Sequence, residues 1–264
     1  MTGIALWKGK FGQMKSGDRA ISFNYSDSIR ILRGIARADV NCEFDPAVLR
    51  CVFRDAEGRE FARFRCPPAF PVATALSDPG AYGGQVDAEP PEAFVLVLQA
   101  GQAALARTRR GLIYEHRIIR KYMVRKSQGK AQLTHLKTKG KSRLGSRIRL
   151  QQSVEFFEEI NSWLTDRNEE FAPGRILYAC AASLWPHLFH SRIAPPFDKK
   201  DARLMKIPRD FRKATLEELE RMCRFVLRGQ LVYDPAMAAA EALLRALEIT
   251  ADDHDRSATE MASD

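Results

Sequence analysis

Residues 93–106 contain no charged side chain, although 28% of the 264 residues in the chain are charged. Within this segment, residues 94–98 (FVLVL) form a continuous apolar run, which is typical of a buried central strand of a sheet. The run is far shorter than the roughly 20 apolar residues of a membrane-spanning helix. The sequence therefore predicts a sheet that is built around residues 94–98.

The segments that follow alternate between strand and helix patterns. Residues 103–108 and 111–119 are expected to be strands, whereas residues 126–145 show no periodic pattern and are expected to be a long loop. Order returns at about residue 146, where apolar residues recur at helical spacing. The further expected elements are a strand over 176–179, a short helix over 183–189, and a helix that opens with a capping box at 215–218 and stops at Gly229. This alternation predicts an α/β layer.

Residues 1–91 are expected to form a small α+β unit, with a helix over 26–38 and a hairpin whose strands are 50–53 and 60–64. A connector rich in Pro and Gly follows the hairpin and marks the expected boundary. The predicted division of the chain is this N-terminal unit, a domain over 92–230 with the loop 126–145, a C-terminal helix over 231–249, and an acidic flexible tail over 250–264.

The positive charge is concentrated in one strip. The chain has a formal net charge of +9, yet residues 1–92 are neutral and residues 150–264 are net acidic. Residues 107–149 hold 15 Lys and Arg side chains and a single acid, Glu115. A strip of this kind favours contact with nucleic-acid phosphates. An anionic membrane surface is the weaker alternative, because no amphipathic helix with a bulky apolar face overlaps the strip.

Several function classes lack their sequence signals. The sequence contains no Gly-x-Ser-x-Gly motif, no Walker-type phosphate loop and no dinucleotide fingerprint. The five cysteines include no Cys-x-x-Cys pair, which argues against a structural zinc site, and they are expected to be buried, reduced thiols. The N-terminus has no apolar signal segment, so we expect a soluble protein in the cytoplasm.

The order of residues in the basic strip is specific. Residues 121–132 read KYMVRKSQGKAQ, with Gly145 and Arg149 further on, and a second block over 196–215 reads PFDKKDARLMKIPRDFRKAT. Together the two blocks resemble the valosin-associated release-factor-like family, a branch related to eukaryotic peptide-chain release factors. That family includes the ankyrin-repeat and zinc-finger peptidyl-tRNA endonuclease of ribosome quality control. The resemblance covers roughly residues 94–230 and is that of a stand-alone version of prokaryotic type.

The resemblance implies a fold and an activity. The fold would be a release-factor middle domain, an RNase H-like mixed sheet with flanking helices, preceded here by the small N-terminal α+β unit. The activity would be metal-independent and cofactor-free cleavage of peptidyl-tRNA on stalled large ribosomal subunits, which frees the nascent chain. The bond would be either a phosphodiester near the terminal CCA of the tRNA or the peptidyl ester. The implied partners are the large subunit and peptidyl-tRNA, hence RNA rather than DNA and no membrane, for a monomeric protein.

The same resemblance implies site residues. Gln132 stands where release factors carry the glutamine of Gly-Gly-Gln, and its amide can position a water or a 2′-hydroxyl and donate to developing negative charge. The other implied catalytic residues are His116, a group for proton transfer near neutral pH, Tyr122, which can stack on an unpaired base, and Arg125, which can hold a phosphate. The implied substrate-binding residues are Lys121, Lys126, Gly129, Lys130 and Arg149.

The sequence also departs from the family pattern. Lys130 replaces the family's second glycine, Ser127 replaces a basic residue, and residues 150–153 (LQQS) replace much of the run Arg-Arg-Tyr-Asn-Glu. These departures leave an alternative open, in which the domain is a non-catalytic module that binds the ribosome or tRNA. A third reading is a general DNA- or RNA-binding structural protein.

Overall fold

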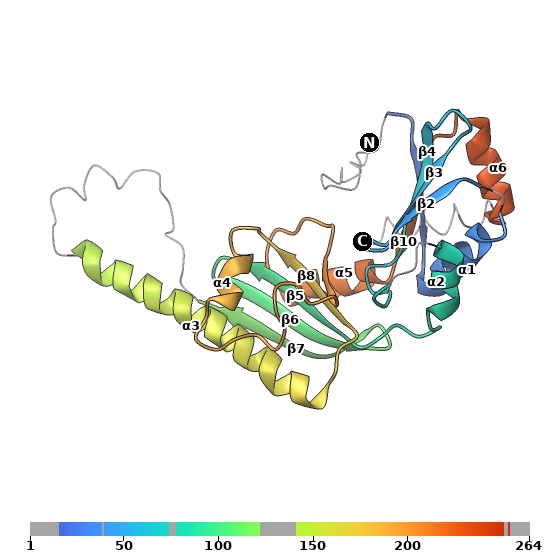
Figure 1. The fold of residues 1–264 in the computed structure, drawn as a ribbon. Coiled ribbons are helices and arrows are strands. Elements are labelled where there is room, and N and C mark those ends of the chain that lie inside the picture. The colour runs from blue at the N-terminus through green and yellow to red at the C-terminus, as the bar shows by residue number, and fades with distance from the viewer. Residues whose placement is uncertain (1–15, 39, 74–77, 122–140, 251–252, 254–264) are drawn as a thin grey trace.

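The computed structural model of the chain describes residues 16–38, 40–73, 78–121, 141–250 and 253, and for residues 141–150 it describes the backbone alone. Two five-stranded sheets form the described fold (Figure 1). The first sheet lies on the right of the view and the second lies in the centre. Helices pack against both sheets, so the predicted α/β class is confirmed.

The second sheet contains the strands predicted around residues 94–98 and one further short strand: β5 (Ala93–Gln99), β6 (Gln102–Arg109), β7 (Leu112–Arg120), β8 (Arg175–Cys180) and β9 (Leu204–Lys206). Their spatial order is β7-β6-β5-β8-β9. The first three strands form an antiparallel meander, β8 is parallel to β5, and β9 is parallel to β8. This order is that of an RNase H-like sheet, as the resemblance implied.

Side chains of β5 alternate between the two faces of this sheet. Phe94 and Leu96 are fully buried in a cluster with helix α3 (Lys141–Glu170). Val95 is fully buried in a second cluster with helix α5 (Leu216–Val226), whose N-cap Thr215 accepts a hydrogen bond from the Glu218 amide as the capping box predicts. Because the second cluster continues into the first sheet, the two sheets share an apolar core.

Helix α3 begins earlier than the sequence predicts. The expected loop extends to residue 145, whereas the structure places the start of the helix at Lys141. Residues 141–150 have a basic, Gly- and Ser-containing sequence with a weak apolar pattern, so periodicity does not reveal the first turns. The short helix α4 (Trp185–Phe189) lies within the range predicted for it.

The first sheet is antiparallel throughout, with the order β1-β10-β4-β3-β2. Its strands are β1 (Arg19–Phe23), β2 (Cys42–Asp45), β3 (Arg50–Arg54), β4 (Glu60–Arg65) and β10 (Gly229–Tyr233). The sequence analysis identified β3 and β4 and missed the other three. A strand from the C-terminal part of the chain therefore completes the N-terminal unit.

Strand β10 occupies a range in which the sequence predicts only a helix stop and a helix. Gly229 begins the strand and does not stop α5, which already ends at Val226. A Cβ at Gly229 would collide with the Ser28 hydroxyl and lie 3.0 Å from the Phe64 ring. The glycine is thus needed for close packing of β10, and the following helix α6 (Ala238–Ala246) starts only after the strand.

Helices α1 (Tyr25–Ile35), α2 (Pro79–Gln85) and α6 lie along one side of the first sheet (Figure 1). The side chain of Asn24 caps α1 by accepting from the Asp27 amide at 2.8 Å. The sequence predicts a connector in the α2 region because three glycines and a proline argue against a helix. Asp78 nevertheless caps α2, and the missing Cβ atoms of its glycines allow it to lie directly against α1.

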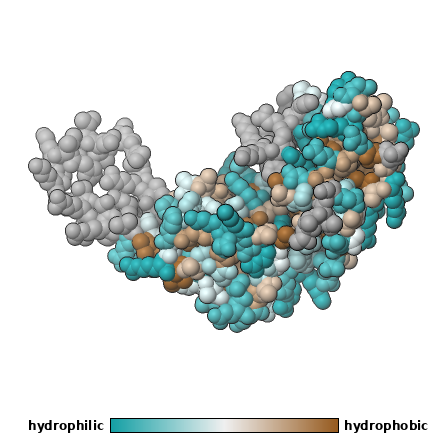
Figure 2. Space-filling model, viewed as in Figure 1, coloured by the Kyte–Doolittle hydropathy of each residue, from teal (hydrophilic) through white to brown (hydrophobic). Residues whose placement is uncertain are grey.

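The described helices do not include one with the length and apolar character needed to cross a bilayer. The face drawn in Figure 2 is mostly hydrophilic.

All five cysteines are free thiols, and four of them are buried, as predicted, while Cys42 is half-buried.

The contact between α1 and α2 gives a matched test of packing. A Cβ at Gly80 would collide with the Cβ of Ala36, whereas a Cβ at Gly84 would have no atom within 4 Å. We expect Gly80→Ala to lower the free energy of unfolding by about 1–3 kcal/mol. Gly84→Ala should leave it unchanged or raise it by up to about 1 kcal/mol. Urea denaturation of both variants checks this, and equal effects would contradict the close contact.

Candidate functional site

The residues predicted to act fall into three groups in the structure. His116 and Lys121 are described in full, and Arg149 lies in α3 with only its backbone described. The remaining predicted residues lie outside the described part of the chain, in the segment 122–140: Tyr122, Arg125, Lys126, Gly129, Lys130 and Gln132. The two ends of this segment are described, because β7 ends at Arg120 and α3 begins at Lys141.

Helix α3 consists of a packed half and a projecting half. It has 30 residues, which corresponds to about 45 Å at 1.5 Å per residue. In the part whose side chains are described, full burial starts at Phe156 and includes Ile160 and Leu164, which pack on the second sheet. The N-terminal half extends past the end of the sheet (Figure 1). The segment 122–140 therefore joins the end of an edge strand to the tip of a projecting helix.

A series of ion pairs holds β7 against α3. Glu115 accepts from Arg167 at 2.6 Å, and Arg117 donates to Glu159 at 3.0 Å. The ammonium of Lys121 lies 3.2 Å from a Glu159 oxygen and 3.8 Å from a Glu155 oxygen. Positions rise along β7 as they fall along α3, so the contacts form an antiparallel ladder. We call this set the ion-pair ladder: Glu115, Arg117, Lys121, Glu155, Glu159 and Arg167.

The ladder follows from the alternation of side chains along a strand. Glu115, Arg117 and Ile119 are two residues apart and point to the face that α3 covers. Ile119 is buried in the α3 cluster between the charged positions. The ladder thus borders an apolar contact on the edge strand and ends at Lys121, the last described residue before the segment 122–140.

Glu155 is oriented by two glutamines that precede it on α3. The Gln151 amide donates to one carboxylate oxygen at 2.9 Å, and the Gln152 amide donates to the other at 3.0 Å. These glutamines belong to the run that departs from the family pattern. In this chain they hold the carboxylate that faces Lys121.

The basic partners keep two ladder carboxylates ionised. Hydrogen bonds from Arg167 hold the pKa of Glu115 below its usual value, with Arg107 adding to the effect and partial burial opposing it. Partial burial acts to raise the pKa of Glu159, but hydrogen bonds from Arg117 and Lys121 outweigh it, so the pKa is lowered. The lowered pKa values of Glu115 and Glu159 therefore favour their charged forms.

The basic strip is less positive in space than along the sequence. Of its six described Lys and Arg side chains, five have a carboxylate within 4.0 Å, and most of these carboxylates come from α3 or from Glu89 and Glu92. Arg107 is buried, stacks 4.4 Å from the Phe171 ring centroid and pairs with Glu115 and Glu170. Among the described residues, Arg120 has no such partner. In this described part of the strip, the positive charge available to phosphates is therefore smaller than the sequence count indicates.

His116 and Lys121 are not brought together. His116 lies opposite Ala106 of β6 and is exposed. Its neighbours Glu115 and Arg117 bond to α3, so His116 points to the other face of the sheet. At about 3.3 Å per residue, it also lies roughly 13 Å from the end of β7. The resemblance placed both side chains in one site, which requires substrate to contact both faces of the edge strand.

A family model described as "Bacteroidetes VLRF1 release factor" matches residues 93–233, more than half of the chain. The chain belongs to this family. The match begins at β5 and ends at β10, so it includes the ladder and the segment 122–140. A search of curated proteins finds no match. Among solved structures, the chain is similar to the "Vms1 mitochondrial localization core" at 13% identity and a TM-score of 0.39, over 76% of this chain and 79% of that chain.

The sequence of this VLRF1 family member did not reveal that two carboxylates of α3 belong to the ladder. Glu155 and Glu159 were visible beside the apolar positions of the predicted helix. Their partners are between 34 and 42 positions away in sequence, and no local pattern reveals a contact over that separation. The described residues hold no cluster of three or more His, Cys, Asp or Glu side chains that could bind a metal ion.

The ladder's charge predicts a pH-dependent stability. Glu115→Gln should lower the free energy of unfolding at pH 7 by about 1–2 kcal/mol, since Arg107 loses a partner while Glu115 is partly exposed. The folded pKa of Glu115 is depressed, so its contribution is complete above the unfolded value of about 4.3 and is lost as pH falls through the folded value. The difference between the two proteins in denaturation curves should therefore shrink as the pH falls below the unfolded value of about 4.3 toward the lower folded pKa of Glu115.

Glu89→Gln is the matched control, because its pair with Arg110 is exposed on both sides. We expect this change to cost less than about 0.5 kcal/mol at pH 7. A Glu115→Gln effect that is no larger, or that persists unchanged at pH 3, would contradict the assigned role of the ladder.

Proposed function

We propose that this protein is a ribosome-associated release factor homologue that cleaves peptidyl-tRNA and frees nascent chains from stalled large subunits. The observation that carries the proposal is the match of residues 93–233 to a release factor family. It is supported by the ladder, which holds the end of β7, the strand that precedes the segment with Gln132, against α3, the helix that follows this segment.

The proposed chemistry has two forms. In the first, the 2′-hydroxyl beside a phosphodiester near the CCA end attacks phosphorus and the 5′-oxygen of the next nucleotide leaves, so the peptide carries away a short nucleotide stub. In the second, water attacks the ester carbonyl, and the peptide acid and an intact tRNA result. Gln132 would position the nucleophile in either case, and Arg125 with Lys126 and Lys130 would hold phosphates and offset developing charge. No metal or cofactor is required for this set of roles.

Roles are also proposed for the other predicted residues. Tyr122 is proposed to stack on an unpaired base, and Gly129 to allow close approach of the backbone to the sugar-phosphate chain. Arg149 is proposed to contact substrate from α3, and Lys121 from the last rung of the ladder. His116 is proposed as the proton-transfer group. Its position sets a condition, namely that the acceptor end must reach the face of β7 opposite α3.

Gln132→Ala tests the proposal. We expect it to slow cleavage of labelled peptidyl-tRNA on stalled large subunits by about 10²–10³-fold, the cost of one lost transition-state donor. Gel electrophoresis of the wild-type reaction distinguishes the two bonds, because only phosphodiester cleavage shortens the tRNA. Gln128→Ala, in the same segment, is the matched control and should retain most of the rate. A substrate that stays equally intact with wild type and with Gln132→Ala would contradict the proposed activity.

The alternative function is a module that binds ribosome or tRNA without cleaving it. It is favoured by Lys130 and Ser127 at family positions and by the engagement of Gln151 and Gln152 with Glu155. This function predicts tRNA binding that weakens steeply with salt and is unchanged by Gln132→Ala, together with intact substrate in the cleavage assay.

A further inference from the structure

A row of arginines lies on α1, at the opposite end of the molecule from the projecting tip of α3 (Figure 1). Ser26, Arg30, Arg33 and Arg37 are exposed and follow one another at intervals of four, three and four residues. This spacing places them on one face of α1 and its C-terminal extension. The row belongs to the first sheet's helical layer and has no part in the site described above.

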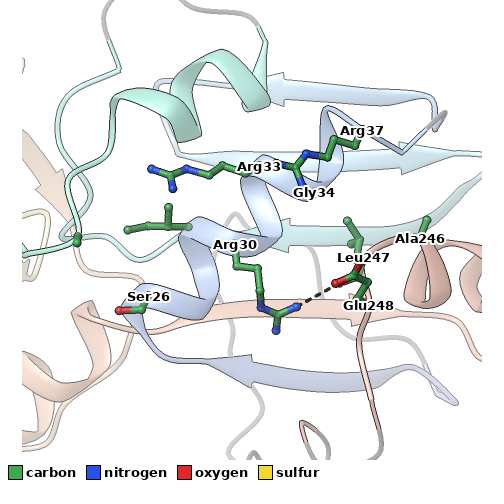
Figure 3. Close-up of a pocket in the computed structure, with 10 residues that line it drawn as sticks. Ser26, Arg30, Arg33, Gly34, Arg37, Ala246, Leu247 and Glu248 are labelled. Atoms are coloured by element: carbon green, nitrogen blue, oxygen red, sulfur yellow. Dashed lines mark hydrogen bonds between the residues drawn. The ribbon is translucent and has the colours of Figure 1, made fainter.

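A cavity of about 450 Å³ opens beside this row (Figure 3). Its walls come from α1, from Ala88, and from the C-terminal end of α6. The lining contains three arginines, one carboxylate and no aromatic ring: Ser26, Ile29, Arg30, Arg33, Gly34, Arg37, Ala88, Ala246, Leu247 and Glu248. Without a ring on which a base or an apolar ligand could stack, the cavity suits a small polar anion.

Arg30 has a structural role at one end of the cavity. It donates to the carbonyl oxygen of Leu247 at 3.3 Å, which satisfies an acceptor at the end of α6 (Figure 3). It also lies 3.6 Å from Asp27 and 3.9 Å from Asp253. Its charge is therefore largely balanced within the protein.

Arg33 and Arg37 make the other end of the cavity positive. Arg33 donates through Nε to the carbonyl oxygen of Gly83 at 3.0 Å, a contact that orients the guanidinium without neutralising it. Among the described residues, no carboxylate lies within 4.0 Å of either side chain. Gly34 lies between them in the cavity lining and adds no side chain there. Two oriented or exposed guanidinium groups beside a polar hollow are suited to a phosphate group.

A second polar cavity on the first sheet shows a different arrangement. The side chains that line it include three arginines matched by three carboxylates: Glu43, Asp45, Arg50, Arg54, Glu60 and Arg63. That surface is charge-balanced, so the excess beside α1 is a local property of the Arg33–Arg37 end.

We propose that the cavity beside α1 is a second RNA contact, in which Arg33 and Arg37 bind a backbone phosphodiester irrespective of the base. The inference rests on the proposed function for the presence of RNA as the ligand. It adds a contact at the opposite end of the molecule from the segment with Gln132, so the N-terminal unit binds RNA as well as completing the fold.

The test compares two double variants of the full chain with the same charge change. Arg33→Gln/Arg37→Gln should weaken binding of deacylated tRNA about tenfold at low salt. It should also lower the slope of log affinity against log salt by about 0.7, the value for one lost phosphate contact. Arg54→Gln/Arg59→Gln, on the β3–β4 hairpin of the same unit, should change affinity by less than about twofold. If the double variant does not fold, the binding test is made with Arg37→Gln alone, since Arg37 has no partner among the described residues.

Equal weakening by the two double variants would overturn the proposal, because it would reflect net charge alone. It would also be overturned if Arg33→Gln/Arg37→Gln left tRNA binding unchanged but abolished binding to vesicles of anionic lipid. Gln132→Ala separates this inference from the proposed function. If that variant cleaves normally while the arginine variants still lose affinity, the cleavage assignment fails and the second RNA contact stands.

Discussion

The ion pairs between β7 and α3 are the constraint on which the site depends. In the part of α3 whose side chains are described, full burial starts at Phe156, and Ile119 is the buried residue of β7 in the same apolar cluster. The ladder adds charged contacts that continue beyond this apolar contact to Lys121. It therefore holds Lys121, the residue before the segment 122–140, against α3. It does so with charged side chains that the sequence suggests are available for substrate.

The second sheet was largely predictable because its strands are local patterns. The run at 94–98 identifies β5, and short turns fix its antiparallel neighbours β6 and β7. The first sheet was less predictable, since its inner strand β10, which lies between β1 and β4, comes from residue 229 onward and pairs with strands more than 160 positions earlier. Helix α2 was missed for another reason: its glycines lower helix propensity but permit the close contact with α1.

The arrangement of the candidate site could not be predicted from the sequence. The motif at 121–132 identified the family and the segment that carries Gln132. The charge counted along the sequence overstates the positive surface, because carboxylates of α3 and of residues 89–92 form ion pairs with Arg107, Arg109 and Arg117. Alternation along β7 also separates His116 from Lys121 onto opposite faces, which a list of motif residues does not reveal.

If the proposed cleavage takes place, the ladder should help to position the segment with Gln132. This role of the ladder is tested most directly by the single-turnover rate of a Glu155→Gln/Glu159→Gln variant on stalled large subunits, with its unfolding curve measured in parallel. We expect this variant to fold and to cleave at least about tenfold more slowly than wild type, because small displacements of the groups that position a substrate strongly reduce the reaction rate. A folded variant that cleaves at the wild-type rate would contradict it.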